Sequence, residues 1–403
     1  MTDRPHVLFV DDEPAMLSGL RRMLRAQRDR WDMSFAVGGE EAMAILTSKQ
    51  CDVVVSDFRM PGMDGAALLQ NVRDHHPEAA RIILSGHTDE TDLLKVILLA
   101  HQFVNKPCTG DDIIAAVERV LALRASFSNA DVRREVTGIE FLPSPPSTLR
   151  DLLAALESND VSPRSVAQTL ERDPAATAKI LQVVNSASAG TSRRISDITQ
   201  AVSLLGLRNV RALVLMHDLV HDFHPTTIAG VDWVGHLAGH SVETSRLARL
   251  LSDGAPWADD AFAGGLLLDI GQLVLAWCRP DAFSQHYLAW HHREGALADI
   301  EARTFGVDHA AAGAYLLSLW GLSFNVIQAA AEHARSTAPP DLTGPVGAVI
   351  AAHRIVEAEL GPVCGPRDGG PPVDEEQFDP AIRKRLARWR ADLHREGTEP
   401  VDD

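Results

Sequence analysis

The chain has 403 residues, of which 45% are hydrophobic, and its 55 acidic residues outnumber its 38 basic residues, giving a formal net charge of −17. This length favours two or three domains, and the acidic charge argues against a large nonspecific nucleic-acid footprint while allowing a local basic patch. The hydrophobic residues are too interrupted for a membrane-spanning helix, the N-terminus lacks the pattern of a signal peptide, and the four cysteines have no paired spacing. We therefore expect a cytoplasmic protein with free thiols and no membrane partner.

Residues 1–123 alternate short apolar segments with helical patterns. The apolar segments are HVLFV, DVVVS, RIILS and HQFV, and their nearly continuous hydrophobicity is typical of strands buried on both faces of a parallel sheet. The last helical pattern places Ile113, Val117 and Val120 on one helix face. Alternating strands and helices predict a doubly wound α/β domain with right-handed crossovers.

Each of these four apolar segments leads to a polar residue. The first ends at Asp11 and Asp12, the second at Asp57, the third at Ser85, and the fourth reaches Lys106. Strand ends of an open parallel sheet share one edge, where clustered carboxylates favour Mg²⁺ and a lysine neutralises an incoming phosphoryl group. Taken singly, the acidic pair could cap a helix and the lysine could be a surface residue, but the whole set predicts a site where Asp57 becomes an aspartyl phosphate.

Residues 5–123 resemble a response-regulator receiver domain. The resemblance rests on the acidic pair, on Asp57 in SDFRMPGMDG, on Ser85 and on the lysine in KP. It implies a five-stranded parallel sheet, a phosphoacceptor at Asp57, and a sensor histidine kinase or phosphotransfer protein as partner.

The same resemblance implies further roles at this edge of the sheet. Mg²⁺ would be held by Asp12, Asp57 and the main-chain carbonyl of Arg59, with Asp11 assisting through water. Ser85 and Lys106 would contact the phosphoryl group, and Phe103 stands where the family places a switch aromatic. The peptide bond between Lys106 and Pro107 would be cis.

The rest of the chain predicts three further segments. Residues 124–140 are charged and without a strong period, which favours a linker, and residues 141–360 show helical periodicity almost throughout and predict an all-α domain. Residues 361–377 are rich in proline, glycine and acidic residues and predict a flexible segment. A last helix over about 379–396 carries an apolar stripe among basic residues, which favours packing against the body of the protein by charge; contact with RNA or a membrane surface is the alternative.

Within the helical region, the segment GGLLLDIGQLVL has the pattern of a metal-dependent phosphohydrolase of the HD type, in which an adjacent His-Asp pair binds a metal. Leu268 occupies the histidine position directly before Asp269, and Gln272 stands where a lysine is common. The other positions of this degenerate site are occupied by histidines, with the last replacing an expected aspartate: His240, His309, His333 and His353. Because two ligands are missing, we expect no metal in this domain and expect Asp269 to be a buried hydrogen-bond acceptor near the histidines.

A second histidine pair offers an alternative metal site. His217 and His221 lie four residues apart in LMHDLVHDFHP and would share one face of a helix. They lie outside the apolar rhythm around Asp269, which favours a partly exposed helix end over a metal site.

Residues 139–360 resemble an HDOD domain, the output-domain relative of the HD hydrolases. The resemblance rests on FLPSPP, ERDPAATAKILQVVNSAS, ISDITQAVSLLGLRNVRALVL, FGVDHAAAGAYLLSLWGL and AAAEH. It implies a largely noncatalytic regulatory domain with an unknown output partner. A Gly-Tyr-Pro signature, which would indicate cyclic-di-GMP hydrolysis, does not occur in the chain.

Together these observations predict a two-component response regulator whose phosphorylated receiver controls a noncatalytic HDOD domain. Two alternatives stay open. The first is a metal-dependent phosphohydrolase acting on a cyclic dinucleotide or another nucleotide, which would need a complete metal site. The second is a nucleic-acid-binding regulator, which would need a helix-turn-helix motif or a broad basic face. The oligomeric state, a homodimer included, is not determined by these patterns.

Overall fold

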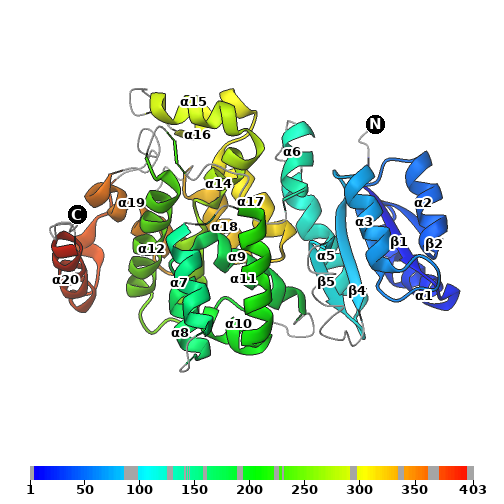
Figure 1. The fold of residues 1–403 in the computed structure, drawn as a ribbon, viewed down its shortest axis with the longest axis horizontal. Coiled ribbons are helices and arrows are strands. Elements are labelled where there is room, and N and C mark those ends of the chain that lie inside the picture. Colours follow the sequence, from blue (N-terminus) through cyan, green and yellow to red (C-terminus); the bar gives the residue numbers. More distant parts are fainter. Residues whose placement is uncertain are drawn as a thin grey trace.

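The structure is a computed structural model that describes residues 4–85, 99–124, 130–139, 142, 144, 146–157, 161–187, 194–221, 227–228, 231–290, 297–334, 340–361 and 372–396. Figure 1 shows a sheet domain at one end of an elongated molecule and a helical domain beside it. Both domain classes agree with the sequence-based predictions.

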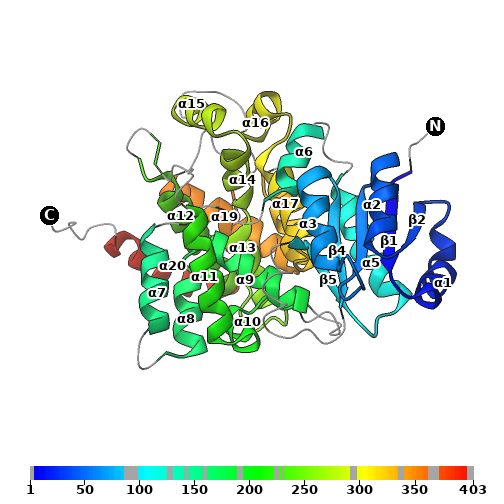
Figure 2. The same cartoon turned by 45° about the vertical axis from the view of Figure 1, so that its right-hand side comes forward.

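The N-terminal domain contains a parallel sheet with the strand order β2-β1-β3-β4-β5. Its strands are β1 (His6–Asp11), β2 (Asp32–Val37), β3 (Val53–Asp57), β4 (Ala80–Ser85) and β5 (Gln102–Asn105). The helices that cover it are α1 (Pro14–Met23), α2 (Gly39–Ser48), α3 (Gly65–His75) and α5 (Gly110–Arg124), with a short 3₁₀ helix η1 (Leu24–Gln27) after α1 (Figures 1 and 2). Strands β1 and β3 are buried almost completely, as their continuous hydrophobicity predicts.

The strand register brings the polar strand ends to one edge of the sheet. Val10 of β1 pairs with Ser56 of β3, so that Asp11 and Asp57, the next residues, lie at the same edge. Ser85 pairs with Asn105, the residue before Lys106. The parallel order thus gathers residues that are distant in the sequence, as predicted from the strand ends.

The C-terminal domain is helical, and its described residues contain only one isolated β-bridge, between Ile228 and Val231. Its helices are α7 (Pro146–Glu157), α8 (Pro163–Leu170), α9 (Pro174–Ala187), α10 (Ile198–Leu205), α11 (Leu207–His221), α12 (Trp233–Leu251), α13 (Ala258–Leu267), α14 (Ile270–Cys278), α15 (Pro280–Trp290), α16 (Leu297–Phe305), α17 (His309–Leu319), α18 (Phe324–Glu332) and α19 (Pro345–Leu360). Helices α12, α13, α18 and α19 pack together around the centre of the domain.

The segment predicted as a linker contains a helix, α6 (Ala130–Thr137). Val132 and Val136, four residues apart, are fully buried, and the helix packs against α14 and α17. This helix was not predicted from the sequence, because charged residues dominate the segment and only one apolar residue per turn faces the core.

The two domains meet where β5 and α5 pack against α17 and α9. Gln102 of β5 donates from Nε2 to the carbonyl oxygen of Ser318 in α17 at 2.8 Å, and the Ser318 hydroxyl donates to the carbonyl of Arg119 in α5 at 2.6 Å. Helix α6 joins this contact, since the hydroxyls of Thr137 and Tyr315 lie 3.3 Å apart. These hydrogen bonds are buried or half-buried, so the contact is a packed interface between the domains.

Helix α20 (Pro380–Glu396) docks on the helical domain at the end of the molecule far from the sheet (Figure 1). Leu386 is buried in a cluster with residues of α12 and α19, and Trp389 donates from Nε1 to Glu243 at 2.9 Å. Arg390 forms ion pairs with Glu359 and with Glu375, which lies in the short 3₁₀ helix η2 (Glu375–Gln377). The predicted docking of the last helix on the body of the protein is therefore confirmed, while most of the predicted flexible segment lies outside the described residues.

Among the residues that the structure describes, one segment, Ala258–Cys278, has the length and composition of a membrane-spanning helix. It comprises α13 and α14 and their junction, and 83% of its most apolar 18-residue window is buried inside the protein. That burial is the pattern of a core helix, and one such segment is weak evidence for a membrane span.

Candidate functional site

The predicted phosphorylation site brings three charged side chains from three strand ends into direct contact. Lys106 donates from Nζ to Asp57 Oδ1 at 2.5 Å and to Asp11 Oδ2 at 3.0 Å. The carboxylate of Asp11 is almost fully buried, that of Asp57 is 13% exposed, and the lysine side chain is 24% exposed. One cation therefore bridges two carboxylates at the edge of the sheet.

Burial acts on the pKa values of Asp57 and Lys106 in opposite directions. Burial raises the pKa of Asp57, with the neighbouring charge of Asp11 adding to the rise, and the contact with Lys106 opposes it without cancelling it. Burial would lower the pKa of Lys106, but the hydrogen bonds to Asp57 and Asp11 raise it above its usual value. The lysine is accordingly held as a cation, and the carboxylate of Asp57 lies in a partly desolvated setting.

The remaining residues predicted for this site lie around the same edge. Asp12 follows Asp11 and is half-buried, and the backbone N–H of Arg59 donates to Asp57 Oδ2 at 3.2 Å. Ser85 ends β4 and Phe103 lies within β5, but the side chains of both lie outside the described part of the chain. The Lys106–Pro107 peptide bond is cis, as the resemblance implied.

The donor set at this edge fits a magnesium ion. Three carboxylates, from Asp11, Asp12 and Asp57, lie at the ends of two neighbouring strands, and the main-chain carbonyl of Arg59 lies two residues beyond Asp57. Oxygen ligands of this kind are those that Mg²⁺ prefers. With a single lysine set against these carboxylates, the site has the charge to hold a divalent cation.

The helical domain gathers all four histidines of the degenerate HD site around Asp269. His240 lies in α12, His309 begins α17, His333 directly follows α18, and His353 lies in α19. Two overlapping groups have ligand atoms within 4.8 Å of one another, one formed by Asp269 with His240 and His353 and the other by Asp269 with His309 and His333. All five residues are at most 4% exposed, so this cluster, here called the histidine cluster, lies within the core.

Asp269 is the centre of the histidine cluster. Its Oδ1 lies 3.4 Å from His333 Nε2 and 4.0 Å from His309 Nε2, and its Oδ2 lies 3.4 Å from His240 Nδ1. Gln272 donates from Nε2 to Oδ1 at 3.3 Å. Burial alone would raise the pKa of Asp269, but the neighbouring imidazoles of His240 and His333 lower it well below the usual range, so the carboxylate is an anion.

Sequence reasoning missed Glu301, which supports the cluster from α16. Its Oε2 accepts from the backbone N–H of His309 at 2.8 Å and from the His309 ring at Nδ1, 2.5 Å away, and the side chain is fully buried. The sequence holds no signal for this contact, because Glu301 lies eight residues earlier on a separate helix.

Local packing fixes Asp269 against α17. Leu268 and Asp269 form the junction between α13 and α14, and the Leu268 side chain is buried in an apolar cluster with residues of α12, α18 and α19. Gly271 lies so close to α17 that an added Cβ would fall 1.8 Å from the carbonyl oxygen of His309. Asp308 begins α17 by accepting from the N–H of Ala311 at 2.7 Å, which places His309 in the first turn beside Asp269.

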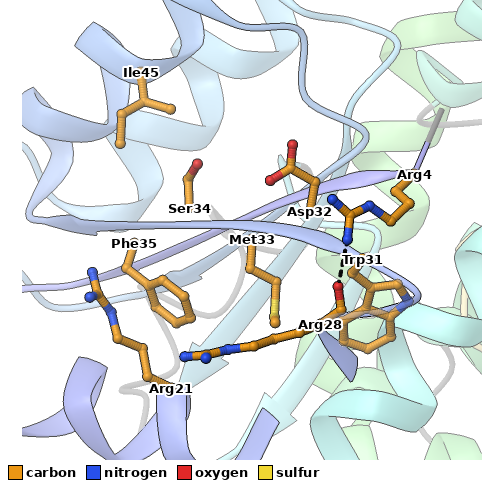
Figure 3. A pocket seen from close by; sticks show the side chains of 9 residues that line it. All are labelled: Arg4, Arg21, Arg28, Trp31, Asp32, Met33, Ser34, Phe35 and Ile45. Atoms are coloured by element: carbon orange, nitrogen blue, oxygen red, sulfur yellow. Dashed lines mark hydrogen bonds between the residues drawn. The ribbon is translucent and has the colours of Figure 1, made fainter. Parts of the chain in front are cut away.

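The second histidine pair, His217 and His221, lies in α11, with side chains outside the described residues. A surface cavity of about 460 Å³ lies beside β2 and α1 in the sheet domain (Figure 3). Three arginines line it, and the Arg21 guanidinium lies 4.6 Å from the ring centroid of Phe35. None of the residues predicted for the phosphorylation site lines this cavity.

Comparison with known families assigns both domains. Residues 7–118 match the response regulator receiver domain, and residues 142–336 match the HDOD domain. The hydrogenase transcriptional regulatory protein HoxA of Cupriavidus necator is 35% identical over 130 residues, which cover 32% of this chain and 26% of HoxA. The DNA-binding transcriptional regulator NtrC of Salmonella typhimurium is 40% identical over 89 residues, 21% of this chain and 18% of NtrC. The matches thus span about a quarter or less of these two curated relatives.

Among solved structures, the MmoQ response regulator of Methylococcus capsulatus is 26% identical and covers 63% of this chain and 97% of its own, with a TM-score of 0.48. The signal receiver domain of an HD domain-containing protein from Pseudomonas fluorescens is 28% identical and covers 31% of this chain and 99% of its own, with a TM-score of 0.29.

Proposed function

We propose that this chain, a two-component response regulator with a receiver domain at residues 7–118 and an HDOD output domain at residues 142–336, is controlled by phosphorylation of Asp57. The signal would reach the output domain through β5, α5 and α17. The observation that carries this proposal is the short path from Lys106 to the interface. Lys106 contacts the Asp57 carboxylate and follows β5 directly, while Gln102 at the other end of β5 is hydrogen-bonded to α17.

The chemistry at the receiver follows from the contacts of Asp57. A carboxylate oxygen of Asp57 would attack a phosphoryl donor, forming an O–P bond while the bond to the donor breaks. Lys106, held as a cation by Asp11 and Asp57, would face the negative charge of the transferred group. Mg²⁺, held by Asp12, Asp57 and the carbonyl of Arg59 with help from Asp11, would supply further neutralisation of that charge.

Phosphorylation of Asp57 would change the negative charges that surround the ammonium of Lys106. In the structure its ammonium is shared between two carboxylates, whereas a phosphoryl group on Asp57 would present additional anionic oxygens beside it. A shift of Lys106 would move the end of β5, and β5 is packed directly on α9 and hydrogen-bonded to α17. Ser85 and Phe103 would take part as the family resemblance implies.

The output domain would act by binding another protein. Leu268 stands in place of one metal ligand of an HD hydrolase, and burial of the histidine cluster gives a substrate no exposed ligand to approach. The alternative, a phosphohydrolase acting on a cyclic dinucleotide or another nucleotide, is favoured by the close approach of His240, His309 and His333 to Asp269. Turnover assays on cyclic dinucleotides and nucleotide phosphates with the full chain distinguish the two, since sustained release of product would establish the hydrolase.

The expected partners and location follow from this role. A sensor histidine kinase or phosphotransfer protein would supply the phosphoryl group, and a cytoplasmic location agrees with the free thiols of Cys51, Cys108 and Cys278. Nucleic-acid binding is not part of the proposal, because the likeness to the DNA-binding regulator NtrC covers only 18% of that protein.

The test is phosphorylation of the full chain with a small-molecule phosphodonor, followed by mass spectrometry of trapped peptides. We expect one phosphoryl group, on Asp57, and no labelling of Asp57→Asn or in the presence of EDTA. The matched control is Asp74→Asn, which changes an exposed aspartate on α3 and should label like the natural protein. Undiminished labelling of Asp57→Asn would refute the assignment.

A further inference from the structure

The histidine cluster contains a pair of rings whose facing atoms cannot both be neutral acceptors at rest. The Nε2 atoms of His309 and His333 lie 3.1 Å apart in a fully buried setting. His309 directs Nδ1 at the carboxylate of Glu301, and His333 directs Nδ1 at the carbonyl oxygen of Ala330 at 2.9 Å. Carboxylate and carbonyl oxygens accept, so each Nδ1 carries a hydrogen, and in the neutral form of each ring Nε2 then presents a lone pair.

Two such lone pairs repel each other at this distance unless a proton or a metal ion lies between them. We infer that the histidine cluster binds a transition-metal ion, with His309 Nε2, His333 Nε2 and Asp269 Oδ1 as the primary ligands. This binding role goes beyond the proposed function and does not depend on phosphorylation of the receiver. It also reverses the expectation, drawn from the sequence, that this domain holds no metal.

The distances between the three ligand atoms match those around one ion. A metal–nitrogen bond of about 2.0–2.1 Å in a tetrahedral shell separates neighbouring ligand atoms by about 3.3 Å. The observed separations are 3.1 Å between the two Nε2 atoms, 3.4 Å from His333 to Asp269 and 4.0 Å from His309 to Asp269. A shift of a few tenths of an ångström in His309 would bring all three ligand atoms within bonding distance of one ion.

Histidines on the other side of Asp269 offer further ligands. His240 is 4% exposed, its Nδ1 lies 3.4 Å from Asp269 Oδ2, and its Nε2 has no hydrogen-bond partner. Such a buried polar atom without a partner is costly, and a metal ion supplies the missing interaction. The ring of His353 lies edge-on to the rings of His240 and His333, with centroids 5.3 and 5.2 Å away.

Glu301 restores the negative charge that the sequence analysis judged missing. His353 replaces the expected aspartate, but Glu301 adds a fully buried carboxylate behind His309, so that Asp269 and Glu301 together balance a divalent ion. A carboxylate on the far nitrogen of a ligating histidine also fixes its tautomer and raises its basicity. The hydrogen bond from His309 Nδ1 to Glu301 is of this kind.

The ligand set identifies the class of ion. Several imidazole nitrogens with one carboxylate suit Zn²⁺ or another late first-row divalent ion, whereas Mg²⁺ and Ca²⁺ prefer oxygen. Because all the ligands are buried, the ion would be enclosed and would stabilise the packing of α17, α18 and the α13–α14 junction without an open position for substrate.

The experiment uses the full chain without a polyhistidine tag, purified without chelators. Elemental analysis by inductively coupled plasma mass spectrometry should find about one transition-metal ion per chain. Protein stripped with a chelator should rebind Zn²⁺ or Co²⁺ with a rise in melting temperature, and the Co²⁺ form should show the visible absorption of a nitrogen-ligated site. The receiver site does not interfere, because its ligands are oxygens and Asp57→Asn leaves the histidine cluster intact.

Variants separate the cluster from other histidines. His333→Ala should abolish binding, and Glu301→Gln, which keeps the shape of the side chain, should weaken Zn²⁺ binding about 10- to 100-fold. The matched control is His236→Ala, which removes an exposed histidine one turn before His240 on α12 and should bind normally. The proposal is overturned if the natural protein neither contains nor rebinds an ion, which would leave a proton shared by His309 and His333, or if His333→Ala binds as well as the natural protein. The measurements on the natural protein decide the question even if a variant does not fold.

Discussion

Lys106 is the central contact of the predicted phosphorylation site. Its ammonium neutralises two carboxylates, those of Asp11 and Asp57, which would otherwise repel each other at the edge of the sheet. The sequence placed all three at strand ends, because parallel strands bring their carboxyl ends together. The hydrogen bonds themselves depend on strand register and rotamers, which strand-end patterns do not specify.

Replacing Lys106 by methionine should destabilise the protein, because it leaves two partly or fully buried carboxylates without their cation. The expected loss is about 1–3 kcal/mol in the free energy of unfolding, measured by thermal or urea denaturation near neutral pH. The control is Lys49→Met, which breaks a pair with Asp32 whose side chains are both more than 40% exposed and should cost less than about 1 kcal/mol. Equal losses for the two variants would contradict a special role for Lys106.

The buried carboxylate of Asp173, which caps α9, should make the free energy of unfolding depend on pH. Its Oδ1 accepts from the N–H of Ala176 at 3.0 Å, and burial raises its pKa from 3.8 to about 6 against the opposing hydrogen bonds from Ser144 and Ala176. The folded state therefore binds a proton more tightly than the unfolded chain. The stabilisation that this proton gives is complete below about pH 4 and is lost as the pH rises toward 6.

Asp173→Asn keeps a capping oxygen but cannot ionise. Relative to the natural protein, its stability should rise between about pH 4 and 6 by up to about 3 kcal/mol, which unfolding midpoints across this range would measure. Asp341→Asn is a control of opposite sign, because hydrogen bonds from Thr343 lower the pKa of the exposed Asp341. Parallel pH profiles for the two variants would contradict the burial of Asp173.

At the scale of elements, close helix packing builds the histidine cluster. Helices α14 and α17 approach each other at Gly271 and Gly313. A Cβ atom added to either glycine would lie only 2.8 Å from the backbone nitrogen of the other. Helical periodicity predicted both helices but not their contact, because a glycine in a helical pattern does not reveal which backbone it faces. Glu301 was missed for a similar reason, because its position in a helix does not reveal which residue it contacts, while His309, His333 and Asp269 were singled out by their family positions.

Gly271→Ala should be strongly destabilising, because the new methyl group would clash with the backbone carbonyl of His309. Backbone cannot move aside as a flexible side chain does, so the loss should reach or exceed about 3 kcal/mol. Gly239→Ala is the matched control on the exposed face of α12, where a Cβ meets nothing within 4 Å, and it should gain about 0.5–1 kcal/mol. Thermal unfolding of both variants decides this, and a mild effect at Gly271 would contradict the close approach of the helices.

At the scale of the whole molecule, α17 connects the two candidate sites. It begins at His309 in the histidine cluster and reaches the receiver at Ser318, where the side chain of Gln102 and the backbone of α5 are hydrogen-bonded to it. The sequence identified both domains, but it could not show that α17 serves the cluster and the interface at once. That arrangement depends on tertiary packing between segments about 200 residues apart.

Phosphorylation should therefore alter hydrogen exchange far from Asp57. With beryllofluoride as a phosphoryl mimic, we expect amides of α5 and α17 to exchange at least about fivefold faster, because redirecting Lys106 disturbs β5 and weakens its contact with α17. A ligand shifts two states only by its differential affinity for them, so Asp57→Asn, which cannot bind the mimic in the same way, should show no change. Gln102→Ala removes the hydrogen bond to Ser318 and should exchange faster at α17 even without beryllofluoride. Unchanged exchange in α17 of the natural protein, with the mimic demonstrably bound at Asp57, would show that the receiver signals through another surface.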